Sequence, residues 1–414
     1  MSLSYLWEKA ARPRPLVRLK DHVDLINGFP FDASGFNPSI GTPVIRIRDL
    51  LTGGTETYFD GHVPPEVIVH KGDLLIGMDG DFNAVTWTGP QAALNQRLCL
   101  VRARSSMDQR YLAYVAPILL KAINDVTFST TVKHLSSLDL LAERIPLPPL
   151  ALQRAIADYL DRETGRIDAL IDKKQRLKEL LQERRQTLIT EAISRSHDPG
   201  TAARSDAVTT RRLKHLASIA VSNVDKKTVS DERSVRLCNY TDVYYNERIT
   251  AELPFMEATA SADQIESFGL RADDVLLTKD SETPDDIAVP AYVVADLPDV
   301  VCGYHLALLR PSQEVDGRYL FWALASRSSR EQFSASANGI TRFGLRYDSF
   351  GEVLVPLPPI ATQRAIADYL DGETARIDAL IQRIESQTSL LQEHRQALIT
   401  AAVTGEVEVP GVAA

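Results

Sequence analysis

Residues 146–192 read PLPPLALQRAIADYLDRETGRIDALIDKKQRLKELLQERRQTLITEA, and residues 356–402 read PLPPIATQRAIADYLDGETARIDALIQRIESQTSLLQEHRQALITAA. The two segments lie 210 residues apart, and 32 of their 47 positions are identical without a gap. Repeats of solenoid proteins are far shorter, at roughly 20–50 residues, so this repeat indicates a duplicated half-protein. Each half then consists of a variable module followed by a near-constant segment.

The two constant segments are predicted to be long helices. The proline pairs at 148–149 and 358–359 fix an extended lead-in, and no further proline follows before the linker or the tail. Leucine and isoleucine recur at the seven-residue spacing of a coiled-coil seam. The predicted seam or partner-interface residues are Leu160, Ile167, Leu170, Leu177, Leu181 and Leu188 in the first copy, and Leu370, Ile377, Leu380, Ile384, Leu391 and Leu398 in the second. At about 1.5 Å per residue, such helices form a rod of roughly 60 Å.

The variable modules are predicted to be mixed α/β. Short β-rich runs occupy residues 44–47, 73–76, 98–101, 274–277 and 306–309, and helical apolar spacing occupies residues 109–123 and 318–326. The fold class is therefore α+β, with two mixed α/β modules in tandem separated by two long helices. The predicted boundaries are residues 1–150 for the first module, 151–196 for the first helix, 197–211 for a linker, 212–360 for the second module, 361–405 for the second helix and 406–414 for a tail.

The charge of the chain limits how it can bind nucleic acid. The formal net charge is −9, which argues against coating nucleic acid through electrostatics alone. Basic and acidic residues balance at 15 to 15 over residues 1–152, but stand at 15 to 22 over residues 212–355. Any DNA contact is therefore expected from local basic loops or from a partner protein.

The cysteines and the apolar segments predict a cytoplasmic protein. Cys99, Cys238 and Cys302 are widely spaced and form no CxxC pair, so neither a disulfide framework nor a zinc site is expected. No run of 18 apolar residues occurs, and the opening MSLSYLWEKAARPRPL has neither the apolar core nor the cleavage site of a secretory signal.

No catalytic motif is found in the sequence. It has no GxxxxGK[ST] phosphate loop, no GxGxxG after a predicted strand, no HExxH and no GxSxG. The eight histidines form no ligand-spaced pair. Asp285 is not followed by the [DE]-x-Lys pattern of a nuclease, and Asp172 lies on a predicted coiled-coil helix. The chain is therefore predicted to be non-catalytic, with no metal site and no cofactor of its own.

Two similar but different modules on a rod of identical segments suit a caliper that reads two sites at a fixed distance. One turn of B-DNA is about 34 Å, so two reading heads on such a rod can span two half-sites with an unread gap. Two alternatives stay open. One is a scaffold that organises two protein partners without DNA, and the other is a self-sufficient nuclease-methyltransferase.

The repeated segments PLPPLALQRAIADYLDRETGRIDALI and PLPPIATQRAIADYLDGETARIDALI resemble the conserved regions of type I restriction-modification DNA specificity subunits. Upstream, IRIRDL, GMDGDFNAVTW, LNQRL and TKDSETPDDIAV resemble the target-recognition domains of that family. The resemblance covers nearly the whole chain, and the repeated PLPP…QRAIADYLD segment is its most specific part.

The resemblance implies an architecture and a set of partners. The two helices would pack as a pseudo-twofold antiparallel coiled coil, and each module would read one half-site of a bipartite, gapped target in double-stranded DNA. Two copies of a DNA adenine methyltransferase subunit would dock on this frame, and restriction subunits with translocase and nuclease activity would join them. S-adenosylmethionine would then belong to the methyltransferase partner, and ATP and Mg²⁺ to the restriction partner.

Two loops at matching positions, residues 129–134 and 339–346, are the main predicted DNA contacts. They contain Thr, Lys and Arg and little acid, which suits contacts to phosphates and base edges. The candidate residues are Thr131, Lys133, His134, Thr341, Arg342 and Arg346. Arg342 or Arg346 is expected to read a guanine, and the threonines to bind phosphate. A solvated turn is the alternative interpretation of each loop.

Four further residues are candidates for DNA contact. Asn83 follows Asp79-Gly80-Asp81-Phe82 and is suited to reading adenine, although a structural turn explains this loop equally well. The other three are Arg97, Lys226 and Lys227, where a solvated surface charge is the alternative.

Four residues at the matched helix starts, Gln153, Tyr159, Gln363 and Tyr369, are predicted to form either the hinge between module and rod or part of a partner surface, with core packing as the alternative.

Overall fold

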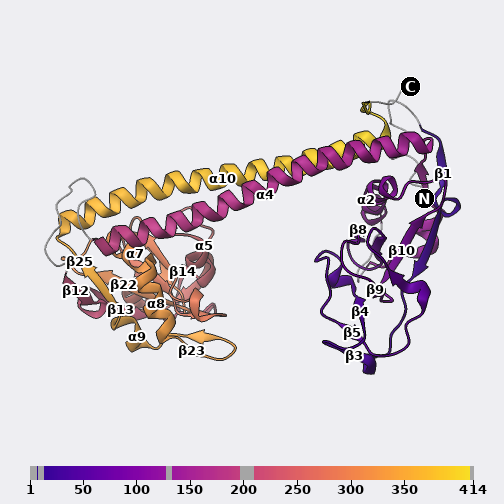
Figure 1. The fold of residues 1–414 in the computed structure, drawn as a ribbon. Helices are drawn as coiled ribbons and strands as arrows, with labels where there is room; N and C mark the ends of the chain where they lie inside the picture. The colour runs from indigo at the N-terminus through magenta and orange to yellow at the C-terminus, as the bar shows by residue number, and fades with distance from the viewer. Residues whose placement is uncertain (1–6, 8–13, 127–132, 196–208, 411–414) are drawn as a thin grey trace. The chain divides into compact units, whose positions relative to one another are not determined.

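The computed structural model describes residue 7 and residues 14–126, 133–195 and 209–410 (Figure 1). The chain divides into two compact units. The first unit comprises residues 1–174 and 386–414, and the second unit comprises residues 175–385. Each unit therefore contains one variable module and one part of each long helix. No helix among the described residues is long and apolar enough to cross a membrane.

The first module contains two sheets of short strands. One sheet has the order β2-β10-β7-β8 and is antiparallel, and the other has the order β3-β5-β4-β9-β6 with β4 and β9 parallel. The strands are β1 (Leu16–Arg18), β2 (Val23–Asn27), β3 (Phe36–Asn37), β4 (Thr42–Ile45), β5 (Tyr58–Phe59), β6 (Ile68–Val69), β7 (Leu74–Gly77), β8 (Ala84–Thr86), β9 (Ala92–Leu94), β10 (Leu98–Ala103) and β11 (Arg144–Pro146). The helices are α2 (Gln109–Val126) and α3 (Ser137–Ala142), and β1 pairs with β11.

The second module contains sheets of order β13-β22-β18-β20-β15, β16-β14-β21-β17 and β19-β24-β23, and β12 pairs with β25. Its strands are β12 (Thr209–Arg212), β13 (Ala217–Val221), β14 (Arg233–Cys238), β15 (Arg248–Ile249), β16 (Met256–Ala260), β17 (Gly269–Leu270), β18 (Val275–Thr278), β19 (Asp280–Ser281), β20 (Pro290–Val293), β21 (Leu297–Cys302), β22 (Leu306–Pro311), β23 (Asn338–Gly339), β24 (Phe343–Gly344) and β25 (Leu354–Leu357). Its helices are α5 (Tyr240–Tyr245), α6 (Ala262–Phe268), α7 (Gly317–Ala325), α8 (Arg327–Ser336) and α9 (Tyr347–Gly351).

The mixed α/β character expected of both modules is confirmed. Each β-rich run expected from the sequence overlaps a strand, namely β4, β7, β10, β18 or β22, although the run 44–47 shares only its first two residues with β4. The two expected helices are α2 and α7. Of the predicted linker, residues 197–211, only the last three residues are described, and they begin β12.

The central strand of each module is buried on both faces. In β7, Leu74 and Ile76 pack into one core cluster and Leu75 into another, because successive side chains of a strand point to opposite faces. In β18, Val275 and Leu277 pack on one side and Leu276 on the other. These two strands fix the position of the loop that follows each of them.

The two long helices are α4 (Leu150–Arg195) and α10 (Ile360–Thr404), and in each unit their segments run antiparallel (Figure 1). In the first unit, Arg395 Nε donates to Asp168 Oδ1 at 2.8 Å, and Lys174 Nζ donates to Gln387 Oε1 at 2.6 Å. A later residue of α4 thus contacts an earlier residue of α10, which confirms the antiparallel packing.

The seam expected between the helices is correct for only one of its two rows. Leu160, Leu188, Leu370, Ile377 and Ile384 are buried. Ile167, Leu181, Leu391 and Leu398 are half-buried.

The second predicted row, formed by Leu170, Leu177 and Leu380, is exposed at 43%, 48% and 48%, so these leucines are not seam residues of this chain. The row that is sheltered lies one residue further on and contains Thr164, Ile171, Lys178 and Arg185. A mixed row of ion pairs and apolar side chains thus faces the opposite helix.

Candidate nucleic-acid interface

An aspartate follows the central strand of each module at matching positions, Asp79 after β7 and Asp280 at the start of β19. Three segments meet at each aspartate through equivalent backbone hydrogen bonds. In the first module, Met78 N–H donates to the Arg97 carbonyl at 3.0 Å, and Leu135 N–H donates to the Met78 carbonyl at 2.7 Å. These hydrogen bonds join three segments of the first module into one loop site.

The second module repeats this arrangement. Lys279 N–H donates to the His305 carbonyl at 2.9 Å, and Leu345 N–H donates to the Lys279 carbonyl at 3.1 Å. Leu135 and Leu345 are 210 residues apart, which is the offset of the duplication. The loop sites are therefore duplicated together with the helices.

Each aspartate holds cationic or imidazole side chains of the neighbouring segments. Asp79 accepts from Arg97 Nη1 at 2.8 Å and contacts His134 Nδ1 at 2.7 Å. Asp280 contacts His305 Nδ1 at 2.7 Å and lies 3.9 Å from Arg342 Nη2. Exposed ion pairs are worth at most about 1 kcal/mol each, so these carboxylates orient the side chains more than they stabilise the modules.

The loop from Asp79 to Asn83 is an ordered turn. Gly80 has a φ of 75° and Phe82 a φ of 50°, and the Phe82 side chain is buried in the module core. The exposed groups of this turn are Asp81 and Asn83. Asn83 thus stands at the surface, where the sequence predicted a reader of adenine, on a turn that is anchored by its neighbour.

The predicted contacts of the first module differ in their surroundings. Thr131 lies outside the described residues. Lys133 is half-buried, and its Nζ donates to the carbonyl and the side-chain oxygen of Asn124 at 2.8 and 3.0 Å. The side chains of His134 and Arg97 are 63% and 59% exposed and are both held by Asp79.

The predicted contacts of the second module are exposed. Thr341 and Arg342 lie between β23 and β24, and Arg346 precedes α9. Lys226 and Lys227 lie in the loop between β13 and β14, where Lys227 Nζ is 3.5 Å from Asp225. DNA contact by the candidate residues of both modules remains a prediction.

Asp79, Asp280 and His305 were not among the site residues predicted from the sequence. The available signal was the alignment of GMDGD with TKDSE and of NQRL with GYHL, which places Asp79 opposite Asp280 and Arg97 opposite His305. These residues were not predicted because the prediction was based on loops with Thr, Lys and Arg and little acid, and all three residues lie outside those loops.

The loop sites are attached to the long helices by a second duplicated network. In the second unit, Gln363 is fully buried, and its Oε1 accepts from Asp316 N–H at 2.9 Å while its Nε2 donates to the carbonyls of Glu314 and Pro358. In the first unit, Gln153 accepts from Asp108 N–H at 2.8 Å. Both glutamines therefore belong to the junction between module and helix rather than to an exposed partner surface.

The tyrosines at the helix starts are less enclosed. Tyr369 is 39% exposed, and Tyr159 is half-buried with the Arg162 guanidinium 5.6 Å from its ring centroid. A role of either tyrosine in partner contact remains a prediction.

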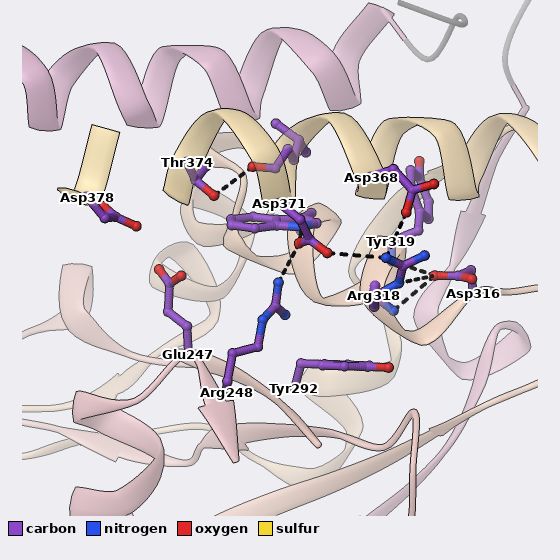
Figure 2. Close-up of polar contacts among 12 residues, drawn as sticks. Glu247, Arg248, Tyr292, Asp316, Arg318, Tyr319, Asp368, Asp371, Thr374 and Asp378 are labelled. Carbon is purple, nitrogen blue, oxygen red and sulfur yellow. Dashed lines mark hydrogen bonds and ion pairs between the residues drawn. The ribbon is translucent and has the colours of Figure 1, made fainter. Parts of the chain in front are cut away.

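Arginine and carboxylate groups complete each junction, and Figure 2 shows those of the second unit. Arg318 Nη1 lies 2.8 Å from Asp368 and 3.3 Å from Asp371, and Trp322 Nε1 donates to Asp371 at 2.7 Å. In the first unit, Arg110 Nη1 lies 2.8 Å from both Asp158 and Asp161. Aspartates on the same face of each long helix thus hold the first turn of α2 or α7.

The second junction contains an additional cation. The Arg248 guanidinium lies 5.1, 4.7 and 5.4 Å from the ring centroids of Tyr292, Phe321 and Trp322, and it donates to Asp371 (Figure 2). Its Nη1 is buried without a hydrogen-bond partner. Asp371 therefore compensates a partly desolvated charge that its first-unit counterpart, Asp161, does not face.

The described residues contain no group of three or more His, Cys, Asp or Glu side chains arranged to hold a metal ion. The three cysteines are buried and unpaired, and burial raises the pKa of the Cys99 thiol to about 12. Paired loop sites on mixed α/β modules, each joined to antiparallel helices, define a recognition scaffold.

Comparisons with known proteins show which proteins the chain is similar to. Residues 16–181 match the model of the type I restriction modification DNA specificity domain. The chain is 41% identical to the type I restriction enzyme EcoBI specificity subunit of Escherichia coli over 173 residues, which are 41% of this chain and 36% of that subunit. It is 20% identical to the MjaVIII specificity subunit of Methanocaldococcus jannaschii over 95% of this chain and 93% of that subunit.

Solved structures share the fold over nearly the whole chain. A chain from a study of complex assembly and conformational transition of the type I R-M system has a TM-score of 0.70 at 17% identity, covering 96% of this chain and 99% of that chain. The HsdS subunit from Thermoanaerobacter tengcongensis has a TM-score of 0.50 at 18% identity, covering 96% and 98%. The resemblance found in the repeated segments is confirmed to this extent: residues 16–181 match the specificity-domain model, and the relatives are named type I restriction enzyme specificity subunits.

Proposed function

We propose that this chain reads a bipartite, gapped target in double-stranded DNA, with one half-site per module, and that it scaffolds methyltransferase and restriction subunits. The observation that carries the proposal is the duplicated loop site around Asp79 and Asp280, whose exposed side chains differ between the modules. Two loop sites with the same framework but different exposed side chains suit two different half-sites. Side chains read the base edges, whereas contacts to the DNA backbone position the protein.

The junction networks support a defined spacing between the half-sites. Gln153 and Gln363, with their arginine and aspartate neighbours, attach each module to a helix through several hydrogen bonds. A module held in this way has little freedom to turn on its helix, so the distance that it reads is set by the rod.

The exposed leucines of the long helices support partner docking. Leu170, Leu180, Leu380 and Leu390 are 43%, 60%, 48% and 62% exposed. Leu170 and Leu380 are separated by the duplication offset of 210 residues, and so are Leu180 and Leu390. An apolar surface that occurs twice suits two copies of one partner, and we assign these to a DNA adenine methyltransferase subunit.

The chemistry then belongs to the partners. S-adenosylmethionine is bound by the methyltransferase subunit, and ATP and Mg²⁺ by the restriction subunit where the system includes one. The complex acts in the cytoplasm, where the genomic DNA of its host lies.

Modification-sensitive sequencing of the host genome with and without this gene tests the proposal. We expect one gapped, adenine-methylated motif to disappear on deletion. An unchanged methylation pattern, with the partner methyltransferase confirmed as expressed, would contradict DNA reading and would leave the scaffold for two protein partners as the better description.

A further inference from the structure

A cleft of about 520 Å³ lies in the second module beside its loop site. One wall consists of Tyr240, Tyr244 and Tyr245 from α5, and the other includes Glu282 and the hairpin residues Thr341 and Arg342. None of the three tyrosines nor Glu282 was a candidate for DNA contact from the sequence.

The tyrosine wall is preorganised. Tyr240 and Tyr244 stack with ring centroids 5.4 Å apart, and Tyr245 packs edge-on against Tyr244 at 5.0 Å. The Tyr244 hydroxyl donates to Asp286, and this hydrogen bond raises the pKa of Tyr244 to about 12. Tyr245 is 76% exposed, so the wall presents one free aromatic face to a ligand.

Two of the three carboxylates in the cleft already have partners. Asp280 is held by His305, and Asp286 accepts from Tyr244. Glu282 is exposed and has no hydrogen-bond or ion-pair partner among the described residues. Its carboxylate is therefore a free acceptor.

Arg342 is a nearly free donor in the same cleft. Its side chain is 62% exposed, and its one approach to an acidic group among the described residues is the 3.9 Å distance to Asp280. Such a distance is too long for a hydrogen bond, so its guanidinium retains its donors for a ligand.

We propose that Glu282 and Arg342 read one C·G base pair of the second half-site in the major groove. The Glu282 carboxylate accepts from the cytosine N4 amino group, and Arg342 donates to O6 and N7 of the paired guanine. Tyr245 packs its ring against the adjoining edge of the DNA. The inference rests on the proposed function, because it presupposes that the second module binds a half-site.

A base pair fits this pair of groups better than a phosphate does. A free carboxylate in the same cleft as Arg342 repels an anion, whereas a C·G pair presents one amino donor and two acceptors side by side. The first module has an equivalent group, since Asp81 follows Asp79 at the same spacing as Glu282 follows Asp280, and Asp81 is also exposed. An exposed acid two residues after the structural aspartate is thus a shared feature of both loop sites.

The test compares the methylated motif of the wild type with that of Glu282→Ala, Arg342→Ala and Glu282→Gln, each expressed as full chain with its methyltransferase. For the two alanine variants, we expect discrimination at one position of one half-site to fall about ten- to a hundred-fold, with the other half-site unchanged. Glu282→Gln should shift preference at that position toward adenine, because a glutamine pairs with N6 and N7 of adenine. Glu266→Ala, an exposed acid on α6, is the matched control and should leave the motif unchanged.

The outcomes separate this inference from the proposed function. A wild-type motif without a C·G pair in the half-site that these variants affect overturns the inference, as does an unchanged motif in all three variants. A wild type that directs no motif at all defeats the proposed function itself. Thermal unfolding of the Glu282→Gln chain, which is nearly isosteric, establishes that any altered motif comes from a folded protein.

Discussion

Arg185 and Asp378 form an ion pair between α4 and α10 of the second unit at 2.9 Å, and their duplicates Arg395 and Asp168 form the same pair in the first unit at 2.8 Å. The two pairs are not equally enclosed. The Arg185 side chain is 17% exposed and also contacts Glu247 at 2.7 Å, whereas that of Arg395 is 36% exposed.

This difference predicts unequal effects of removing the two arginines. Arg185→Ala should lower the free energy of unfolding by about 2 kcal/mol, since it removes charged hydrogen bonds to two carboxylates. Arg395→Ala should cost about 1 kcal/mol or less. Urea denaturation of the full chain measures both, with the exposed neighbour Arg184→Ala as the control. Equal losses for Arg185 and Arg395 would show that the Glu247 contact contributes nothing.

Adjacent leucines of α10 should separate seam packing from partner docking. Leu391 is half-buried in the seam, so Leu391→Lys should destabilise the chain by about 2 kcal/mol. Leu390 is 62% exposed, so Leu390→Lys should change stability by less than about 0.5 kcal/mol but weaken retention of the methyltransferase. Chemical denaturation and co-purification check the two effects. A fully stable Leu391→Lys chain would contradict the seam, and unchanged co-purification of Leu390→Lys would contradict docking at that leucine.

The two junctions should respond differently to loss of an aspartate charge. Asp371→Asn should cost about 3 kcal/mol, because Arg248 is left partly desolvated among aromatic rings without its counter-charge. The duplicate residue Asp161 pairs with the more exposed Arg110 and accepts from the Tyr114 hydroxyl, a hydrogen bond that an asparagine oxygen can also accept. Asp161→Asn should therefore cost about 1 kcal/mol. Unfolding in urea gives both values. If Asp161→Asn proves the more damaging of the two, the additional role assigned to Arg248 is wrong.

The buried carboxyl of Asp274 should make stability depend on pH. Burial raises its pKa to about 6 despite hydrogen bonds from Arg271 and Arg310, so the folded state disfavours the charged form. The resulting penalty is absent below pH 4, grows between about pH 4 and 6, and reaches about 3 kcal/mol at neutral pH. Thermal unfolding at pH 4.5 and 7.5 should show a smaller loss on raising the pH for Asp274→Asn than for the wild type. The exposed control Asp263→Asn should follow the wild type, and identical profiles for all three chains would refute the assignment.

The long helices and the mixed modules were predictable because their signals are local. The spacing of apolar residues in the repeated segments predicts the helices. Runs such as 73–76 and 274–277 contain enough consecutive apolar residues to predict buried strands. The second seam row was not predictable, since Leu170 and Ile171 are neighbours and both satisfy a spacing of three or four residues. Only the arrangement of the opposite helix decides between them.

The loop sites were predictable in place but not in composition. The basic loops near Lys133 and Arg342 stand out in the sequence, whereas the carboxylates that hold Arg97, His134 and His305 come from a different strand. The α5 tyrosines also escaped notice, because three tyrosines in six residues are as typical of a core as of a binding surface. The composition of the loop sites depends on contacts between segments that are far apart in the sequence.

The core of the first unit includes Leu19 and Val23 together with Ile399 and Val403 of α10. During synthesis, these early and late residues are separated by the emergence of the entire second module from the ribosome. The first unit therefore cannot complete its core until almost all of the chain has been translated, whereas the second unit, residues 175–385, is a continuous stretch. The order of folding is expected to invert the order of translation, and a ribosome stalled late in the message should leave the first module incompletely packed.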